Sequence, residues 1–239
     1  MAMVVWFFAG GGESEVEGLV PFLEVNFPGC NFERKTPIKS KPGSKPGRGS
    51  GYGLTGRGLA KQIKERLKSC MTQGQLGDLI LVIDDLDCHD SDKKEGMFVA
   101  AISSVAGADE IPRYVGFASP EIEAWIIADW DNTLARHPDF HERQAGMRDW
   151  LSENGIGFDE PESFSQLNKY GTSCDSKLSD LIIESSQEKG CKQRYRKGMH
   201  TPELIKKINP DTVSSKCPHF KKLYNYLRDL CDQREPQIN

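Results

Sequence analysis

Three features are missing from this sequence: paired cysteine motifs, long apolar runs and a strong excess of one charge. The seven cysteines are scattered, odd in number and without a Cys-x-x-Cys pair, which predicts reduced thiols in a cytoplasmic protein rather than a disulfide framework. No apolar run approaches the roughly 18 residues of a membrane span, so no membrane partner is expected. The apolar start, residues 1–8, lacks a basic flank, which favours a buried strand over a signal peptide.

The net charge of −4 conceals a basic stretch. Between Glu33 and Cys70, eleven lysines and arginines accompany two glutamates, so this stretch carries +9 and the remaining chain about −13. Within it, residues 39–58 are rich in Gly, Pro, Ser, Lys and Arg, which predicts a flexible basic loop. Such a stretch suits binding to a polyanion such as DNA or RNA, although a solvated loop without a ligand explains it too. The candidate ligands are Lys41, Lys45, Arg48 and Arg57.

Apolar strands alternate with amphipathic helices up to about residue 131. This alternation predicts an α/β fold with a mostly parallel sheet flanked by helices. After that point the strand pattern fades into short helical segments with Gly- or Pro-bearing connections. We therefore expect an α/β domain over residues 1–135 and a helical C-terminal portion, residues 136–239, packed on it.

The most informative segment is Leu79–Asp87, in which five apolar residues run directly into acids. An unbroken apolar run of this length is typical of a strand buried on both faces, and ligands bind at the carboxyl ends of such strands. If the segment stays extended, Asp85 and Asp87 point to the same side. Two converging carboxylates suit Mg²⁺. The alternative is a polar turn in which Asp84 or Asp85 caps the next helix.

Two further acidic pairs stand at the starts of expected helices. Glu13 and Glu15 follow the glycines at positions 10–12, and Glu121 and Glu123 follow Ser119-Pro120. Carboxyl ends of parallel strands meet at one sheet edge, so all three acidic pairs are able to share metal ions there. The glycine turn also offers backbone N–H groups to a phosphate. Acids in a first helical turn are alternatively explained by the helix dipole.

Residues 119–129, Ser-Pro-Glu-Ile-Glu-Ala-Trp-Ile-Ile-Ala-Asp, resemble the Pro-Glu-x-Glu-Ala-Trp signature of a bacterial Toprim-like family, domain of unknown function 4276. The segment Lys-Cys-Pro-His-Phe at 216–220 resembles that family's C-terminal pattern. The glycine turn with its Glu and the strand ending in Asp-x-Asp are similar to the Toprim domain of topoisomerases, primases and overcoming-lysogenization-defect nucleases.

This resemblance implies a Mg²⁺-dependent nuclease, with Mn²⁺ as a possible substitute, acting on DNA or RNA in a bacterial anti-phage or mobile-element defence system, where a protein from the same operon is a further partner. It places the catalytic acids at Glu13, Asp85, Asp87 and Glu123, and Glu121 beside them as a metal ligand. Many relatives carry an acid directly before the triple glycine, where this chain has Ala9. A module that binds nucleic acid or a protein without cutting is therefore the main alternative.

A second basic cluster, Lys-Gln-Arg-Tyr-Arg-Lys at 192–197, interleaves cations with an aromatic ring. Lys192, Arg194, Arg196 and Lys197 are candidates for neutralising phosphoryl oxygens, and Tyr195 for stacking on a base; a charged turn between helices explains the cluster equally. The spacing of His137 and His141 would suit zinc on a helix, but no third ligand is evident. An Asp-x-Asp nucleotide-sugar transferase would explain Asp85 and Asp87 but not the Glu-Ala-Trp segment.

Overall fold

The α/β prediction is confirmed by a computed structural model that describes residues 2–36 and 54–232, apart from the side chains of residues 13–15 and 232. Four strands form one parallel sheet in the order β2-β1-β3-β4, with parallel registers of β1 with β2 and with β3. The strands are β1 (Met3–Ala9), β2 (Cys30–Thr36), β3 (Leu79–Asp85) and β4 (Arg113–Ala118).

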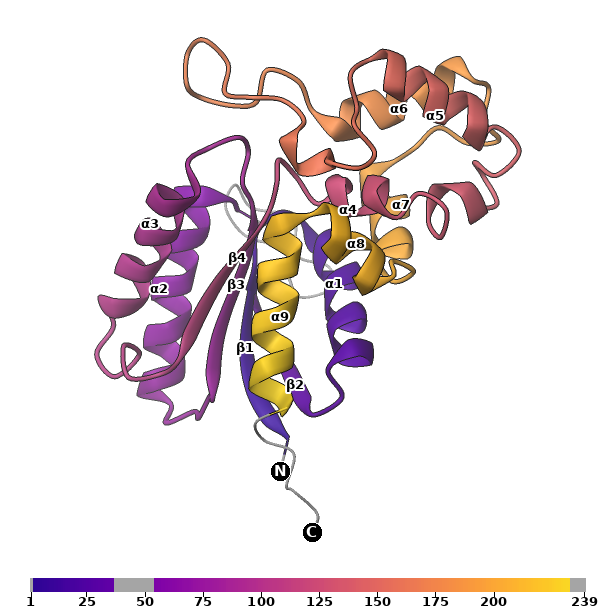
Figure 1. The fold of residues 1–239 in the computed structure, drawn as a ribbon. Coiled ribbons are helices and arrows are strands. Elements are labelled where there is room, and N and C mark those ends of the chain that lie inside the picture. Colours follow the sequence, from indigo (N-terminus) through magenta and orange to yellow (C-terminus); the bar gives the residue numbers. More distant parts are fainter. Residues whose placement is uncertain (1, 37–53, 233–239) are drawn as a thin grey trace, which may run out of the picture. The chain divides into compact units, whose positions relative to one another are not determined.

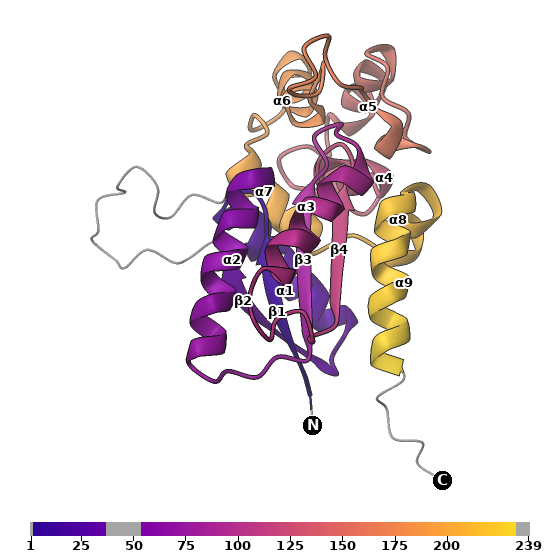
Figure 2. The ribbon, with the colours of Figure 1, turned by 90° about the vertical axis from the view of Figure 1, so that its left-hand side faces the viewer.

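Helices connect these strands and make up most of the chain after β4. In the sheet region, α2 and α3 cover one face, and α1 lies on the other with the last part of α9 (Figures 1 and 2). The α-helices are α1 (Glu13–Asn26), α2 (Gly56–Thr72), α3 (Ser91–Ser103), α4 (Glu123–Ala128), α5 (Gln144–Glu153), α6 (Leu178–Glu188), α7 (Lys197–Ile205), α8 (Pro210–Lys216) and α9 (Pro218–Asp232).

The two central strands are buried on both faces, as their unbroken apolar sequences predict. Residues 79–82 of β3 are all fully buried, and Trp6, Phe7 and Phe8 of β1 are equally inaccessible. On α2, Leu59, Ile63 and Leu67 recur every fourth residue and are fully buried, because this spacing keeps them on one helical face. The basic residues of α2 occupy the remaining faces.

The chain divides into two compact units, and the domain boundary at residue 135 stays a prediction. The first unit comprises the described residues within 1–84, 91–116 and 225–239, and the second comprises residues 85–90 and 117–224. The loop after β3 and the Glu-Ala-Trp helix α4 thus belong with the later helices, because α4 packs against α6, α7 and α8. The end of α9 belongs with the sheet, where Tyr226 stacks on Tyr114 of β4.

Three local expectations are corrected. The extended segment ends at Asp85, and Asp87 and Cys88 adopt positive φ of 51° and 60°, so the alternation that would align Asp85 with Asp87 stops between them. Of the acids placed at the start of the helix after Ser119-Pro120, only Glu123 is helical, because α4 begins there and Ile122 is its N-cap. Helix α8 was not predicted; it is short and begins at a proline.

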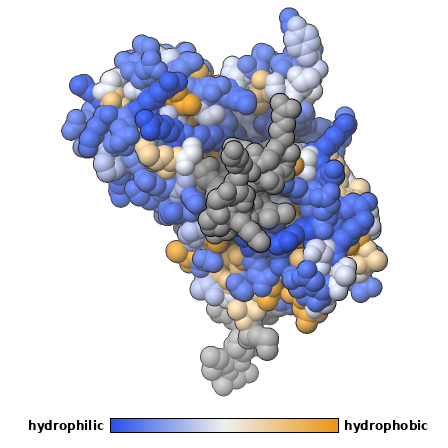
Figure 3. Space-filling model, turned by 180° about the vertical axis from the view of Figure 1, so that it is seen from behind, coloured by the Kyte–Doolittle hydropathy of each residue, from blue (hydrophilic) through white to orange (hydrophobic). Residues whose placement is uncertain are grey.

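The surface of the described residues gives no sign of a membrane span. None of the helices in the described ranges is long and apolar enough to cross a bilayer. On the face drawn in Figure 3, these residues are mainly hydrophilic, and hydrophobic ones occur in small separate groups.

Candidate functional site

Three carboxylates converge on one ammonium group in the second unit. Lys197 Nζ lies 3.0 Å from an oxygen of Glu121, 3.0 Å from an oxygen of Glu123 and 3.9 Å from Asp85. The side chain of Glu123 is fully buried, whereas those of Asp85 and Lys197 are 16% and 31% exposed. The acid–lysine cluster, defined by these four residues, is therefore closed on the Glu123 side and open to solvent on the Asp85 side.

Each carboxylate of the acid–lysine cluster is also held by a second donor. Glu121 accepts the backbone N–H of Ser179 at 2.7 Å and its hydroxyl at 3.0 Å. Glu123 accepts the Thr201 hydroxyl at 2.8 Å, and Asp85 accepts the backbone N–H of Ile122 at 3.0 Å. Such outer contacts fix the direction of carboxylates that bind a cation. The three acids are thus oriented independently of the lysine.

The charges of the acid–lysine cluster are strongly perturbed. Burial raises the pKa of Glu123, and the nearby Lys197 only partly offsets this. Burial alone would lower the pKa of Lys197, but the carboxylates of Glu123, Asp85 and Glu121 outweigh it and raise that pKa. Lys197 therefore stays positively charged. Its charge does not fully compensate the cost of burying the Glu123 carboxylate. Strongly shifted groups of this kind concentrate at functional sites.

A second polar cluster, formed by His137, Asp139 and His200, brings potential ligand atoms within 4.8 Å of one another. Its hydrogen bonds do not suit a metal. Nδ1 of His137 accepts the backbone N–H of Asp139, and Nδ1 of His200 accepts that of Arg196. Each ring then carries its proton on Nε2, which faces the carboxylate of Glu203 at 3.1 Å in His137 and that of Asp139 at 3.4 Å in His200.

A metal-bound imidazole instead donates a hydrogen bond from its second nitrogen to an acceptor. A metal on Nδ1 would displace the backbone N–H that this atom accepts, and a metal on Nε2 would place a proton on Nδ1, facing the same N–H. This second polar cluster is better explained as a buried hydrogen-bonded contact between α7 and the segment before α5. The zinc hypothesis for His137 and His141 is not supported either, because His137 meets His200 and not His141. Burial also lowers the pKa of His200, which favours the neutral ring that these bonds require.

The sequence pattern of one protein family, described as Domain of unknown function (DUF4276), matches residues 54–228, nearly three quarters of the chain. The chain belongs to the DUF4276 family. No curated protein and no solved structure matches it. All four residues of the acid–lysine cluster lie inside the DUF4276 match, whereas the glycine turn and Glu13 precede it.

Of the predicted acids, the structure brings together Asp85, Glu121 and Glu123. Asp87 lies on the left-handed turn after β3, where its backbone N–H donates to the Pro120 carbonyl at 2.8 Å. The side chain of Glu13 lies outside the described residues, as does that of Glu15. Ala9 is buried at the end of β1, so an acid at this position would also be buried.

The predicted basic ligands fall into three groups. Lys41, Lys45 and Arg48, together with most of the expected 39–58 loop, lie outside the described residues. Among the described residues, four candidates are exposed and one is not: Arg57, Lys192, Arg194 and Arg196 are exposed, whereas Lys197 is turned into the acid–lysine cluster.

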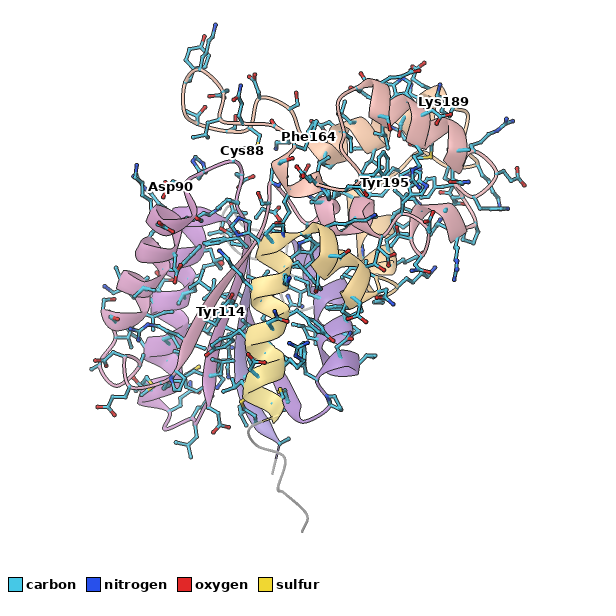
Figure 4. All side chains as sticks on the ribbon, viewed as in Figure 1. Cys88, Asp90, Tyr114, Phe164, Lys189 and Tyr195 are labelled. Atoms are coloured by element: carbon cyan, nitrogen blue, oxygen red, sulfur yellow. A yellow bond between two sulfur atoms is a disulfide. The ribbon has the colours of Figure 1, made fainter. Side chains whose placement is uncertain are left out.

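The expectation that Tyr195 stacks on a base is wrong. Its ring is buried and its hydroxyl lies 2.7 Å from that of Thr201, so it cannot stack on a base, and Figure 4 shows it among the C-terminal helices. Tyr195 thereby supports Thr201, the residue that holds Glu123. Sequence reasoning missed this role because tyrosine between cations reads equally well as a surface residue.

The expectation of reduced cysteines is also corrected. Cys88, directly after Asp87, forms a disulfide with Cys174. The five other cysteines form no disulfide in the part of the chain that the structure describes, and three of them are buried. The number and spacing of the cysteines did not indicate this bond. Cys88 and Cys174 are 86 positions apart, and they are joined because the fold brings their two loops together.

Asp84 is a further buried acid, in the first unit. Its carboxylate lies 2.9 Å from Lys94 Nζ and accepts the backbone N–H of Gly56 at 3.0 Å. A Cβ on Gly10 would collide with this carboxylate, which explains the glycine at the end of β1. The sheet order places this pair where β1 and β3 lead to opposite sides, the position at which parallel sheets bind ligands. Both partners are almost fully buried, which fits a structural ion pair.

Proposed function

We propose that this DUF4276 protein is a Mg²⁺-dependent, Toprim-type hydrolase of nucleic-acid phosphodiesters, acting on DNA or RNA in the cytoplasm as part of bacterial defence. One observation carries the proposal: Asp85, Glu121 and Glu123, from separate parts of the sequence, converge beside the carboxyl end of a buried strand. The resemblance of the Asp-x-Asp and Glu-Ala-Trp segments to Toprim-like proteins supports the choice of reaction.

The donor set of the acid–lysine cluster suits a hard cation. If all four groups are ionised, three carboxylates and one ammonium leave a formal charge of −2, which a divalent ion would balance. Carboxylate oxygens are the ligands that Mg²⁺ prefers. Within the described residues, these acids do not form a group with all ligand atoms within 4.8 Å, since the ammonium separates them. The Lys197 ammonium must therefore move from between the acids to their side, still within the cluster, before all three acids can hold one ion.

Each residue of the cluster has a distinct task in this proposal. Asp85 and Glu123 hold the cation, and Glu121, fixed by Ser179, completes the set. When bound, Mg²⁺ would supply a water of lowered pKa and a positive charge for the phosphate oxygens. Lys197, released from the acids, neutralises charge that develops on the phosphoryl group. The exposed Lys192, Arg194 and Arg196 would contact the backbone of the substrate.

One observation favours a second candidate, a module that binds nucleic acid without cutting it. The ammonium of Lys197 occupies the position between the carboxylates, and a protein that uses lysine as a permanent counter-ion needs no metal there. The nucleotide-sugar transferase alternative is weaker, because it depends on Asp85 and Asp87 acting as a pair, and the positive φ of Asp87 interrupts their alternation.

The test is cleavage of plasmid, single-stranded DNA and RNA by the full chain, with Mg²⁺ or Mn²⁺ and with a chelator. We expect metal-dependent cleavage that falls at least about a hundredfold in Glu123→Gln, the scale on which single electrostatic groups act in catalysis. The matched control is Glu142→Gln, which removes an acid whose side chain is 81% exposed and should cleave normally.

The outcomes separate the two candidates. Binding to nucleic acid without cleavage under any metal would favour the non-cutting module. Cleavage that survives Glu123→Gln unchanged would show that the acid–lysine cluster is not the active site, whatever the protein cuts.

A further inference from the structure

A cavity of about 480 Å³ lies in the second unit beside the loops that carry the acids. Its lining comes from three segments of the chain: Leu86, Cys88 and His89 from the turn after β3, Ser119 and Pro120 before α4, and a later segment with Glu162, Phe164, Ser165, Gln166 and Leu167. The volume is in the range of pockets that hold small organic ligands.

Two segments of this lining are tied to each other. Cys88 forms a disulfide with Cys174, and Cys174 pairs through the backbone with Leu167, another lining residue. Figure 4 shows Cys88 and Phe164 on these two segments of the chain. The turn after β3 is also tied to the segment before Ser119, because the backbone N–H of Leu86 donates to the Ala118 carbonyl at 2.7 Å. The cavity therefore belongs to a braced structure and not to a loose surface loop.

The chemistry of the cavity suits a flat ring with polar edges. Phe164, Leu86 and Pro120 supply aromatic and aliphatic surface, while the Gln166 amide and the His89 imidazole supply donors and acceptors. The one carboxylate of the lining, Glu162, already accepts the backbone N–H groups of His219 and Phe220. A nucleobase has the same combination of an apolar face and a hydrogen-bonding rim, and bases in single strands bind by stacking on aromatic side chains.

The cavity is placed to serve the acid–lysine cluster. Leu86 follows Asp85 directly and Pro120 directly precedes Glu121, so their Cα atoms are about 3.8 Å from those of the acids. The backbone contact from Asp87 to Pro120 joins the same two loops. A nucleotide whose base fills the cavity would thus have its phosphate near the acids.

We propose that this cavity is a nucleobase subsite, which holds one unpaired base of a single-stranded substrate by stacking on Phe164 next to the acid–lysine cluster. The inference rests on the proposed function for its substrate class. It adds a preference that the acids alone do not give: the base beside the scissile phosphate must be unstacked, so single strands should bind better than duplexes.

The test measures affinity in the presence of a chelator, so that no cleavage occurs. A labelled oligothymidylate is compared with an abasic strand of equal length by fluorescence anisotropy. We expect Phe164→Ala to weaken binding of the oligothymidylate about fivefold or more, the size of one base–aromatic stack, and to leave binding of the abasic strand unchanged. Gln166→Ala, which removes an exposed side chain, should weaken the same complex without any risk to the fold.

The matched control is Tyr170→Ala, which removes a 74% exposed aromatic ring from the same loop but not from the cavity. Equal losses in Tyr170→Ala and Phe164→Ala, or equal losses for both strands, would overturn the subsite. The proposed function fails separately: Phe164-dependent binding without metal-dependent cleavage keeps the subsite and removes the nuclease, and cleavage with unchanged affinity in Phe164→Ala does the reverse.

Discussion

Replacing Lys197 by methionine removes the positive charge that the three carboxylates share, and the consequence should depend strongly on pH. At an effective dielectric constant of about 20, each contact near 3 Å is worth about 5 kcal/mol before desolvation. Removing one partner of a buried pair costs about 3–5 kcal/mol, because the other charge stays buried. Glu123, which is fully buried, is the group that bears most of this cost.

Protonation limits the loss. The ordinary pKa of Glu123 is 4.5, and neutralising one carboxylate costs about 1.4 kcal/mol for each pH unit above that value. For Lys197→Met, the penalty from Glu123 is then about 4 kcal/mol at pH 7.5 and about 1 kcal/mol at pH 5. The sign follows from the raised pKa: the folded variant binds the proton more tightly than the unfolded chain, so stability falls as pH rises above 4.5.

Urea denaturation of Lys197→Met and wild type at both pH values measures this difference. Lys192→Met makes the same charge change at an exposed position and should cost less than about 0.5 kcal/mol at either pH. Equal losses at pH 5 and pH 7.5 would refute the reasoning, because they would mean that packing of the lysine stem and not its charge stabilises the cluster. Mg²⁺ should also stabilise the variant more than wild type, since binding to the folded state raises stability.

Three further predictions concern other parts of the molecule. Gly10→Ala should destabilise by about 1–3 kcal/mol through overpacking against Asp84, whereas Gly29→Ala, which meets no atom within 4 Å, should be neutral in the same denaturation assay. Burial raises the pKa of Glu162 to about 7, so wild-type stability should decline from pH 4.5 to 7 by at most about 1.4 kcal/mol per unit, and Glu162→Gln should flatten that decline; an unchanged slope would contradict it. Cys174→Ser should cost about 2–4 kcal/mol and abolish the effect of dithiothreitol on stability; seven titratable thiols in unreduced protein would show that the bond does not form.

The sheet could be predicted from the sequence because its signals are local. The apolar run before Asp84 and the four-residue spacing of Leu59, Ile63 and Leu67 each need only one segment to be interpreted. Helix α8 was not predicted in this way, because its seven residues are too few to show a helical spacing of apolar residues. The return of the chain to the sheet at the end of α9 was not visible in the sequence for a different reason: a contact of that range leaves no mark in a local pattern.

The candidate site was predictable only in part. The acids were found because carboxylates after a buried strand, or before a helix, are conspicuous. Lys197 was also a candidate, but its pairing with the acids was not predicted, because it stands 112 positions after Asp85 in a basic run that equally suggests a surface for phosphates. Lys197 is the first residue of α7, and the packing of that helix against α4 is what directs the ammonium inward. The same packing buries Tyr195 and leaves its neighbours Arg194 and Arg196 at the surface.

Charge balance suggests how a lysine and a metal can share the acid–lysine cluster. One divalent ion added to three carboxylates and one ammonium brings the formal charge to zero, whereas a second leaves an excess that only an anionic substrate can compensate. Because uncompensated charge is costly at a buried site, we expect one Mn²⁺ to bind the free protein and a second to bind only with an uncleavable nucleic-acid analogue. Counting bound Mn²⁺ by electron paramagnetic resonance, with and without the analogue, measures this directly. Two ions bound to the free protein would mean that Lys197 leaves the cluster altogether, and none in either state would mean that the lysine is its permanent counter-ion.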